Sequence, residues 1–222
     1  MKIFHGSKDI VGVPIFGLGN KYNDYGIGFY CSDDIELAKE WAVGINHDGY
    51  VNVYNLDLSN LTILNLNDSK YCILHWLAIL LENRLFDVKS GIALEAKEYL
   101  LKNFRMDYDK YDVIIGYRAD DSYFAFAQEF LSGSISYRQL NNALRLGNLG
   151  NQIVLKSKKA FETIEFLDSV FVKKDEYFPL KENRDKTARR EYFNNERNKR
   201  QKGDITIINI MDEEMKESDP RL

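Results

Sequence analysis

Residues 26–42 read GIGFYCSDDIELAKEWA, and within them a strand pattern passes directly into a helix pattern. Residues 28–31 are apolar and aromatic and follow a glycine-containing segment, which predicts a short β-strand. A second apolar run at residues 2–5, KIFH, stops at Gly6 and predicts another strand. Short strands that are interrupted by helices favour an α+β domain over a doubly wound parallel sheet.

The helix pattern begins at a cluster of capping residues. Residues 32–34 read SDD, and such side chains accept hydrogen bonds from the free N–H groups of a first helical turn. Glu36 follows Asp33 by three positions, as in a capping box. We therefore expect a helix over about residues 34–43 that carries Trp41 on one face.

The rest of the chain contains further strand and helix patterns. Strands are expected at residues 50–58, 61–66, 112–117, 152–156, 163–172 and 205–211, and helices at residues 69–83, 91–103, 121–131 and 136–147. Ser136 is expected to cap the last of these helices, and Gly147 to end it. Residues 13–25 are rich in Gly, Asn and Asp, and we expect them to form a mobile flap over a pocket.

Length and charge indicate one domain with a distinct C-terminal segment. The chain has 222 residues, 45% of them hydrophobic, and only three prolines, so one core is expected over residues 1–180. The net charge is −4, but basic side chains gather late in the chain. Residues 184–200 predict a helix with Ala188 and Phe193 as its apolar anchors. It belongs to a basic extension, residues 181–222, that ends in a short strand and packs on the same domain.

Cysteine usage and the absence of targeting patterns indicate a cytoplasmic protein. Cys31 and Cys72 lack CxxC or His-rich spacing, so two reduced thiols and no metal site are expected. The first residues lack a signal-peptide pattern, and the longest apolar run, residues 76–81, is too short to span a membrane. His75 lies within an apolar helix pattern and is expected to be a packed histidine.

The two short N-terminal strands place chemistry-bearing side chains close together. The first ends in His5-Gly6-Ser7, the second presents Tyr30, and Trp41 follows Tyr30 by eleven positions on the helix. An imidazole, a glycine and two aromatic rings around one point suit a flat, polar heterocycle. Taken singly, each of these residues is more often structural, and a core role for Trp41 remains the alternative.

These motifs resemble the ADP-ribosyltransferase superfamily in its diphtheria-toxin and poly(ADP-ribose) polymerase branch. His5-Gly6-Ser7 is similar to its first motif, and Gly26-x-Gly28-x-Tyr30 with a later aromatic is similar to its second. The stretches GFYCSDDIELAKEWA, VIIGYRADDSYF and GNQIVLKSKKAF resemble an uncharacterised bacterial family of such domains over roughly residues 1–180. Members of that family look like toxins encoded beside a small partner protein.

The resemblance implies a fold, a cofactor and residue roles. Two facing small sheets would form an NAD cleft, with helices packed outside. The Gly6 backbone and the Ser7 hydroxyl would hold the nicotinamide carboxamide, with Gly28 in the second binding motif. His5 would bond the adenosine-side ribose, and Tyr30 and Trp41 would sandwich the nicotinamide. The reaction would transfer ADP-ribose from NAD to a macromolecular acceptor, either protein or nucleic acid, and release nicotinamide.

The third motif of the superfamily is a glutamate at the start of a late strand, and the matching stretch here contains no carboxylate. Asn151 or Gln152 fills that position, and Gln152 is the favoured match. An amide lacks the negative charge that supports an oxocarbenium-like transition state, a loss on the order of 2 to 4 kcal/mol. Asp120, Asp121 or Glu129 would then have to supply the charge.

The polar cluster after residues 112–117 has two interpretations. Arg118 would hold a pyrophosphate, and Asp120 or Asp121 would orient an acceptor, since sites are often placed where a buried strand ends. The alternative is a strand-end salt bridge with a helix cap, to which Asp121 or Ser122 would contribute.

Three other functions stay open at this point. The first is a catalytically inactive protein that binds NAD or ADP-ribose. The second is an RNA 2′-phosphotransferase, which uses NAD on a similar fold but needs basic residues around its cleft. The third is nucleic-acid binding through residues 184–202, where Tyr192 and Phe193 would stack on bases, against the alternative of a mixed-charge solvated helix. That segment would also suit an acidic partner, and a small antitoxin protein is a further expected partner.

Overall fold

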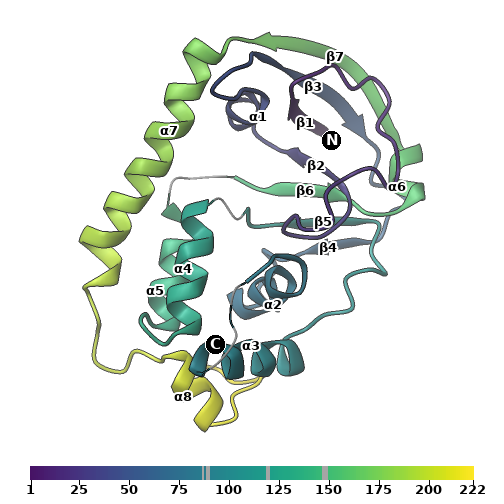
Figure 1. Ribbon diagram of the computed structural model, residues 1–222. Helices are drawn as coiled ribbons and strands as arrows, with labels where there is room; N and C mark the ends of the chain where they lie inside the picture. The colour runs from purple at the N-terminus through teal and green to yellow at the C-terminus, as the bar shows by residue number, and fades with distance from the viewer. Residues whose placement is uncertain (87, 89–90, 119–120, 147–149) are drawn as a thin grey trace.

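A seven-stranded mixed sheet with helices on its faces makes up the protein (Figure 1). The computed structural model describes residues 1–86, 88, 91–118, 121–146 and 150–222. The strands follow the order β4-β5-β6-β2-β1-β3-β7, and among the described residues only β4 and β5 pair in parallel. The expected α+β class is confirmed.

The strands agree with the sequence patterns to within a few residues, except that residues 205–211, expected as a strand, contain a helix. They are β1 (Lys2–Ser7), β2 (Phe29–Ser32), β3 (Gly49–Leu56), β4 (Ile63–Asn65), β5 (Val113–Gly116), β6 (Gln152–Leu155) and β7 (Ile164–Val172). The resemblance predicted two facing small sheets, whereas the described strands form one. The reason is that β2 pairs with β1 along one edge and with β6 along the other.

The helices lie in groups on and around this sheet. They are α1 (Ile35–Ala42), α2 (Ile73–Asn83), α3 (Ile92–Asn103), α4 (Asp121–Leu131), α5 (Tyr137–Ala143), α6 (Lys158–Glu162), α7 (Lys174–Glu191) and α8 (Ile207–Asp212), with a π-helical turn, η2 (Tyr192–Arg197), after α7. Helices α2 to α5 cover the β4-β5-β6 part of the sheet, and α7 runs along the flank of the molecule outside α1 (Figure 1). The main core therefore lies between α2 to α5 and β4 to β6.

Helix α1 starts at Asp34, one of the three expected capping residues. Asp34 is its N-cap and accepts hydrogen bonds from the backbone N–H of Glu36 and Leu37 at 2.8 and 3.4 Å. The capping box between Asp33 and Glu36 was a wrong prediction. The Asp33 carboxylate instead accepts hydrogen bonds from the backbone and side chain of Asn151, across the molecule.

The C-terminal segment departs most from the sequence patterns. Residues 205–211, expected as a strand, contain α8, because Thr206 and Asn209 form a capping box that starts a helix. Helix α7 begins at Lys174, ten residues before the expected helix, so the expected domain boundary at residue 180 falls inside it. The fourth expected helix ends at Ala143, and Gly147 lies outside the described residues.

The apolar anchors of the basic segment are Ala188 and Tyr192 rather than Ala188 and Phe193. Ala188 and Tyr192 are each 1% exposed, whereas Phe193 is 48% exposed. The two buried residues are four positions apart and share a helix face, which Phe193 does not. Tyr192 is therefore not available to stack on a nucleic-acid base.

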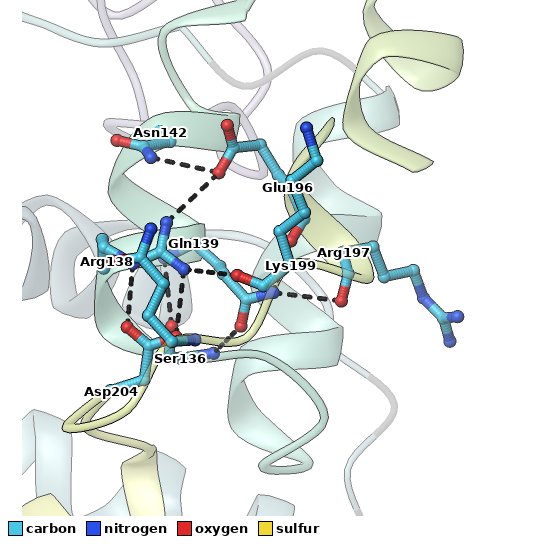
Figure 2. Close-up of polar contacts among 9 residues, drawn as sticks. Ser136, Arg138, Gln139, Asn142, Glu196, Arg197, Lys199 and Asp204 are labelled. Atoms are coloured by element: carbon cyan, nitrogen blue, oxygen red, sulfur yellow. Dashed lines mark hydrogen bonds and ion pairs between the residues drawn. The ribbon is translucent and has the colours of Figure 1, made fainter. Parts of the chain in front are cut away.

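Polar contacts fasten the segment after α7 to α5 (Figure 2). Arg138 donates to both carboxylate oxygens of Asp204, at 2.8 and 3.0 Å, and to the backbone oxygen of Lys199 at 2.7 Å. Gln139 donates to the backbone oxygens of Glu196 and Arg197. These bonds pack the C-terminal segment onto the same body as the sheet. Within the described residues, no helix has the length and apolarity needed to cross a membrane.

Candidate functional site

The sheet opens between β1 and β2, and the candidate site lies at this opening. The two strands pair only at Phe4 and Ser32, after which His5 bridges them through a 2.7 Å hydrogen bond between its Nδ1 and the Tyr30 backbone oxygen. A carbonyl oxygen only accepts, so Nδ1 carries the hydrogen. Burial lowers the pKa of His5, which keeps the ring neutral near pH 7. Nε2 of His5 is therefore left as a hydrogen-bond acceptor.

A cavity of about 380 Å³ lies beside this bridge. Six residues that the sequence singled out line it together: His5, Gly6, Tyr30, Trp41, Arg118 and Gln152. They come from β1, β2, α1, the end of β5 and the start of β6. The remaining lining residues were not singled out by the sequence: the apolar Phe4 and Ala38 and the polar Asn23, Asp24, Arg84 and Lys181.

Tyr30 is a fixed, uncharged wall of the cavity. Its hydroxyl donates to the Gly26 backbone oxygen at 2.5 Å and accepts from the Tyr25 backbone N–H at 3.1 Å. Burial, and to a lesser extent the nearby charge of Asp24, raises the pKa of Tyr30 well above its usual value. Tyr30 can thus present a ring or a neutral hydroxyl to a ligand, but it does not act as an acid near neutral pH.

Trp41 holds two cations at the cavity. The Arg118 guanidinium carbon lies 4.4 Å from the centroid of the Trp41 ring, and the Lys181 ammonium nitrogen lies 4.6 Å from the same centroid. Both distances are within the range of cation–π attraction. Trp41 is half-buried, so it borders the cavity and is not a fully enclosed core residue.

Gln152 and Asn151 lie in different surroundings, although they are neighbours in sequence. Gln152 lines the cavity and is 7% exposed, and its Oε1 has no hydrogen-bond partner among the described residues. The Asn151 side chain donates to Asp33 at 2.7 Å and accepts from Asn67 at 2.9 Å, and it borders a separate hollow. Of the two alternatives, only Gln152 faces the cavity, with an oxygen that a ligand donor would satisfy.

Positive charge dominates the cavity lining. Arg84, Arg118 and Lys181 converge from the end of α2, the end of β5 and α7, against one lining carboxylate among the described residues, Asp24. Asp24 forms an ion pair with Arg84 at 3.4 Å. A cavity with three cations and one acid favours an anionic ligand.

Helix α7 is held in place so that Lys181 reaches the cavity. Arg184, three residues further along α7, donates through two nitrogens to the buried carboxylate of Glu40 on α1, with Nε at 2.9 Å. Lys39 of α1 also donates to the Tyr177 hydroxyl at 3.1 Å. These contacts join α7 to the same helix that carries Trp41.

A second, more apolar hollow of about 410 Å³ shares His5, Asn23 and Tyr30 with the cavity. The loop that was expected to lie over a pocket forms part of its wall, through residues such as Val13, which is 82% exposed. Gly28 borders this hollow and not the main cavity. A Cβ at Gly28 would lie 2.6 Å from Val154 Cγ1, so packing alone requires a glycine there.

Ser7 and Glu129 do not line the cavity. The Ser7 hydroxyl donates to the Asp9 backbone oxygen at 2.6 Å and accepts from Asn52. Glu129 pairs with Tyr192 and Arg197 and holds the C-terminal segment. Asp121 is the first residue of α4, and its side chain, like all of Asp120, lies outside the described part of the structure.

Gly6 has a structural role of its own. A Cβ at this position would lie 2.1 Å from the Ala38 backbone oxygen, so the glycine lets α1 rest directly on β1. His75 is 2% exposed and is a packed histidine, as expected. In the described ranges, no group of three or more His, Cys, Asp or Glu could hold a metal ion.

A family model matches residues 1–166, described as "Protein of unknown function (DUF3990)". The chain belongs to this family. No curated protein and no solved structure matches the chain. The DUF3990 region contains every cavity residue except Lys181, which lies on α7 beyond it.

The cavity residues that sequence reasoning missed have only weak local signals. Asp24 precedes the second strand within a loop of small and polar residues, where an acid is common. Arg84 and Lys181 are single cations on or beside helices. Only the packing of distant elements brings them to one point, so no spacing rule could have selected them.

Proposed function

We propose that this DUF3990 protein is an NAD-dependent ADP-ribosyltransferase. The observation that carries the proposal is the convergence of His5, Tyr30, Trp41 and Gln152 on one cavity with an excess of positive charge. His5, Tyr30 and Trp41 belong to the two motifs that carry the resemblance to the ADP-ribosyltransferases, and Gln152 is the favoured match to the position of the third motif. The four residues are up to 147 positions apart in the chain. The positive lining adds independent support, because NAD carries a diphosphate.

The chemical properties of the lining side chains suit the parts of NAD. The neutral His5 ring offers Nε2 as an acceptor for a ribose hydroxyl, and the amide oxygen of Gln152 lacks a partner and can accept another. Arg84, Arg118 and Lys181 can attract the diphosphate. The cavity thus combines hydroxyl acceptors with phosphate-binding cations.

In the proposed reaction, the bond between C1′ of the nicotinamide ribose and the nicotinamide nitrogen breaks, and its electron pair leaves with nicotinamide. An acceptor nucleophile attacks C1′ and loses its proton. The protein contributes mainly by orienting the ribosyl group and by supporting its developing positive charge.

The test follows NAD binding by calorimetry and nicotinamide release by chromatography in the same samples. Wild-type protein is expected to bind NAD and release nicotinamide, and His5→Ala and Gln152→Ala are expected to lose at least ten-fold in affinity or rate. His47→Ala replaces a histidine outside the cavity lining and serves as the matched control. If wild-type protein does not bind NAD, the proposal is wrong.

A second candidate is an NAD- or ADP-ribose-binding protein without turnover. The specific observation in its favour is that β6 begins with the amide of Gln152 and not with a carboxylate. Such a protein would bind NAD as tightly as proposed above, but nicotinamide release would be absent. The appearance of release in Gln152→Glu alone would support this candidate over the first.

The acceptor is proposed to be a macromolecule, and the protein a cytoplasmic toxin with a small antitoxin partner, as the resemblance implies. Incubation of labelled NAD with protein and whole-cell lysate, followed by protease or nuclease, identifies the acceptor class. The cations of the cavity also meet the main requirement of an RNA 2′-phosphotransferase. That activity would be seen as loss of phosphate from a 2′-phosphorylated RNA in the presence of NAD.

A further inference from the structure

One carboxylate faces the cavity from a place that no motif indicates. Among the described residues that line the cavity, Asp24 is the only acid, and it is 6% exposed. Most of the loop before it is exposed, including Lys21 and Tyr22. A buried acid at the end of an exposed loop needs a physical reason, because taking a carboxylate out of water is costly.

The neighbours of Asp24 fix its position firmly. Tyr25 is fully buried, its hydroxyl donates to the Tyr117 backbone oxygen at 2.7 Å, and its backbone N–H donates to the Tyr30 hydroxyl. Gly26 has a φ of 72°, a conformation that favours glycine, so the turn after Tyr25 is also defined. Asp24 is therefore attached to the same framework that orients Tyr30.

The charge of Asp24 acts on the cavity. After burial, the Asp24 charge is the next cause that raises the pKa of the Tyr25 hydroxyl, and it also contributes to the raised pKa of Tyr30. Arg84 Nε lies 3.4 Å from Asp24 Oδ1 in an ion pair, and the Arg84 side chain remains 27% exposed. The ion pair helps to retain the negative charge of Asp24 beside the cavity.

We propose that Asp24 is the catalytic carboxylate of this cavity and supplies the negative charge that the Gln152 amide lacks. The inference rests on the proposed transferase function. Cleavage of the glycosidic bond places positive charge on C1′ and the ring oxygen, and a nearby carboxylate stabilises that charge. Gln152, which lines the same cavity, would position the ribose through its amide, while Asp24 would act on the reacting carbon.

The proton of the acceptor gives Asp24 a second use in the same step. When the acceptor hydroxyl or amine attacks C1′, its proton passes to the Asp24 carboxylate, while the electron pair of the broken bond departs with neutral nicotinamide. Charge balances, because the positive charge of the nicotinamide ring is cancelled by that electron pair and the proton is held by Asp24 until it passes to water.

The competing explanation is that Asp24 only neutralises Arg84. The two roles predict different effects for the two partners of the ion pair. A catalytic Asp24 makes Asp24→Asn lose turnover with NAD affinity nearly kept, and makes Arg84→Gln lose mainly affinity. A purely structural pair makes both substitutions lower stability and activity together.

The experiment measures NAD affinity by calorimetry, nicotinamide release at saturating NAD, and the midpoint of thermal unfolding. Asp24→Asn is expected to reduce release on the order of 100-fold, with NAD affinity changed less than five-fold. Adding Gln152→Glu to Asp24→Asn is expected to recover at least ten-fold, because it returns a carboxylate to the cavity. Asp109→Asn, at an exposed acid outside the cavity, is the matched control.

The outcomes separate the two proposals. Release by Asp24→Asn within three-fold of wild type overturns the role of Asp24 and leaves the transferase function standing. NAD binding without release by wild-type protein overturns both. If Asp24→Asn does not fold, the double variant Asp24→Asn/Arg84→Gln, which removes the orphaned cation as well, is measured against Arg84→Gln in the same way.

Discussion

Two regions of the molecule contribute to the cavity, and they are positioned by different kinds of interaction. We call residues 2–7 and 26–42 the strand junction and residues 173–222 the C-terminal arm. The strand junction places His5, Tyr30 and Trp41 through local strand and helix geometry. The C-terminal arm brings only Lys181, and does so through side-chain contacts to α1 and α5. The difference teaches that the local part of a site can be read from sequence spacing, whereas the part that depends on docking cannot.

Removal of the ion pair between Arg184 of the C-terminal arm and Glu40 of the strand junction is expected to have the largest effect on stability. Arg184→Met leaves the carboxylate of Glu40 buried without its partner, at a cost of about 3 kcal/mol in the free energy of unfolding. NAD affinity should fall as well, since Lys181 lies on the same helix. Urea unfolding and calorimetry measure the two effects. A loss below 1 kcal/mol would mean that the arm does not depend on this contact.

The close packing of α1 on β1 within the strand junction is tested by adding a methyl group at Gly6. Gly6→Ala places a Cβ against the Ala38 backbone oxygen, so α1 must move away from β1 at a cost of about 2 kcal/mol. Gly12→Ala is the matched control, because nothing lies within 4 Å of its Cβ. Urea unfolding of both variants makes the comparison. Equal stabilities would contradict the close packing of α1 on β1.

The contribution of the arm to ligand binding is tested on α7 alone. Lys181→Met removes one of three cations from the cavity and is expected to weaken NAD binding about ten-fold, or ~1.4 kcal/mol. Lys186→Met, on the same helix with a side chain 71% exposed, should leave affinity unchanged. Calorimetry with NAD compares them. If the two variants bind alike, the arm is not part of the ligand site.

The smallest expected effect concerns the last residues of the arm. Burial opposes the protonation of His75, but its bonds to Cys72 and Glu217 outweigh burial and raise the pKa of His75 above 6.5. The resulting stabilisation is complete below pH 6.5 and is lost as pH rises through the raised pKa. Glu217→Gln should therefore cost less than 1 kcal/mol near pH 6 and nothing near pH 9, because Glu217 is 68% exposed in its side chain. Urea unfolding at the two pH values measures it, and a cost that does not change with pH would contradict it.

Sequence patterns predicted the elements whose signals are local. The strand before Ser32, the helix with Trp41 and the buried strand before Arg118 lie where they were expected, because alternation and capping act over a few residues. Residues 205–211 were wrongly predicted as a strand because their apolar pattern fits a strand as well as a helix. The capping box of Thr206 and Asn209 stabilises the helix.

The candidate site was predicted only in part, for the same reason. Gln152 was already the favoured match over Asn151, but the direction of its side chain toward the cavity follows from the pairing of β6 with β2 and β5. Arg84 and Lys181 join the site from the end of α2 and from α7, through packing over long sequence distances. The sequence around Arg84 and around Lys181 contains no pattern that predicts that both side chains line the same cavity.

The most direct test uses the two tryptophans of the chain as reporters. Trp41 lines the cavity and Trp76 is 1% exposed in the helical core, so their indole N–H resonances give one signal at the site and one away from it. Titration with NAD is predicted to shift the Trp41 resonance saturably and to leave that of Trp76 in place. If neither resonance moves at millimolar NAD, the cavity does not bind NAD and the central claim is contradicted.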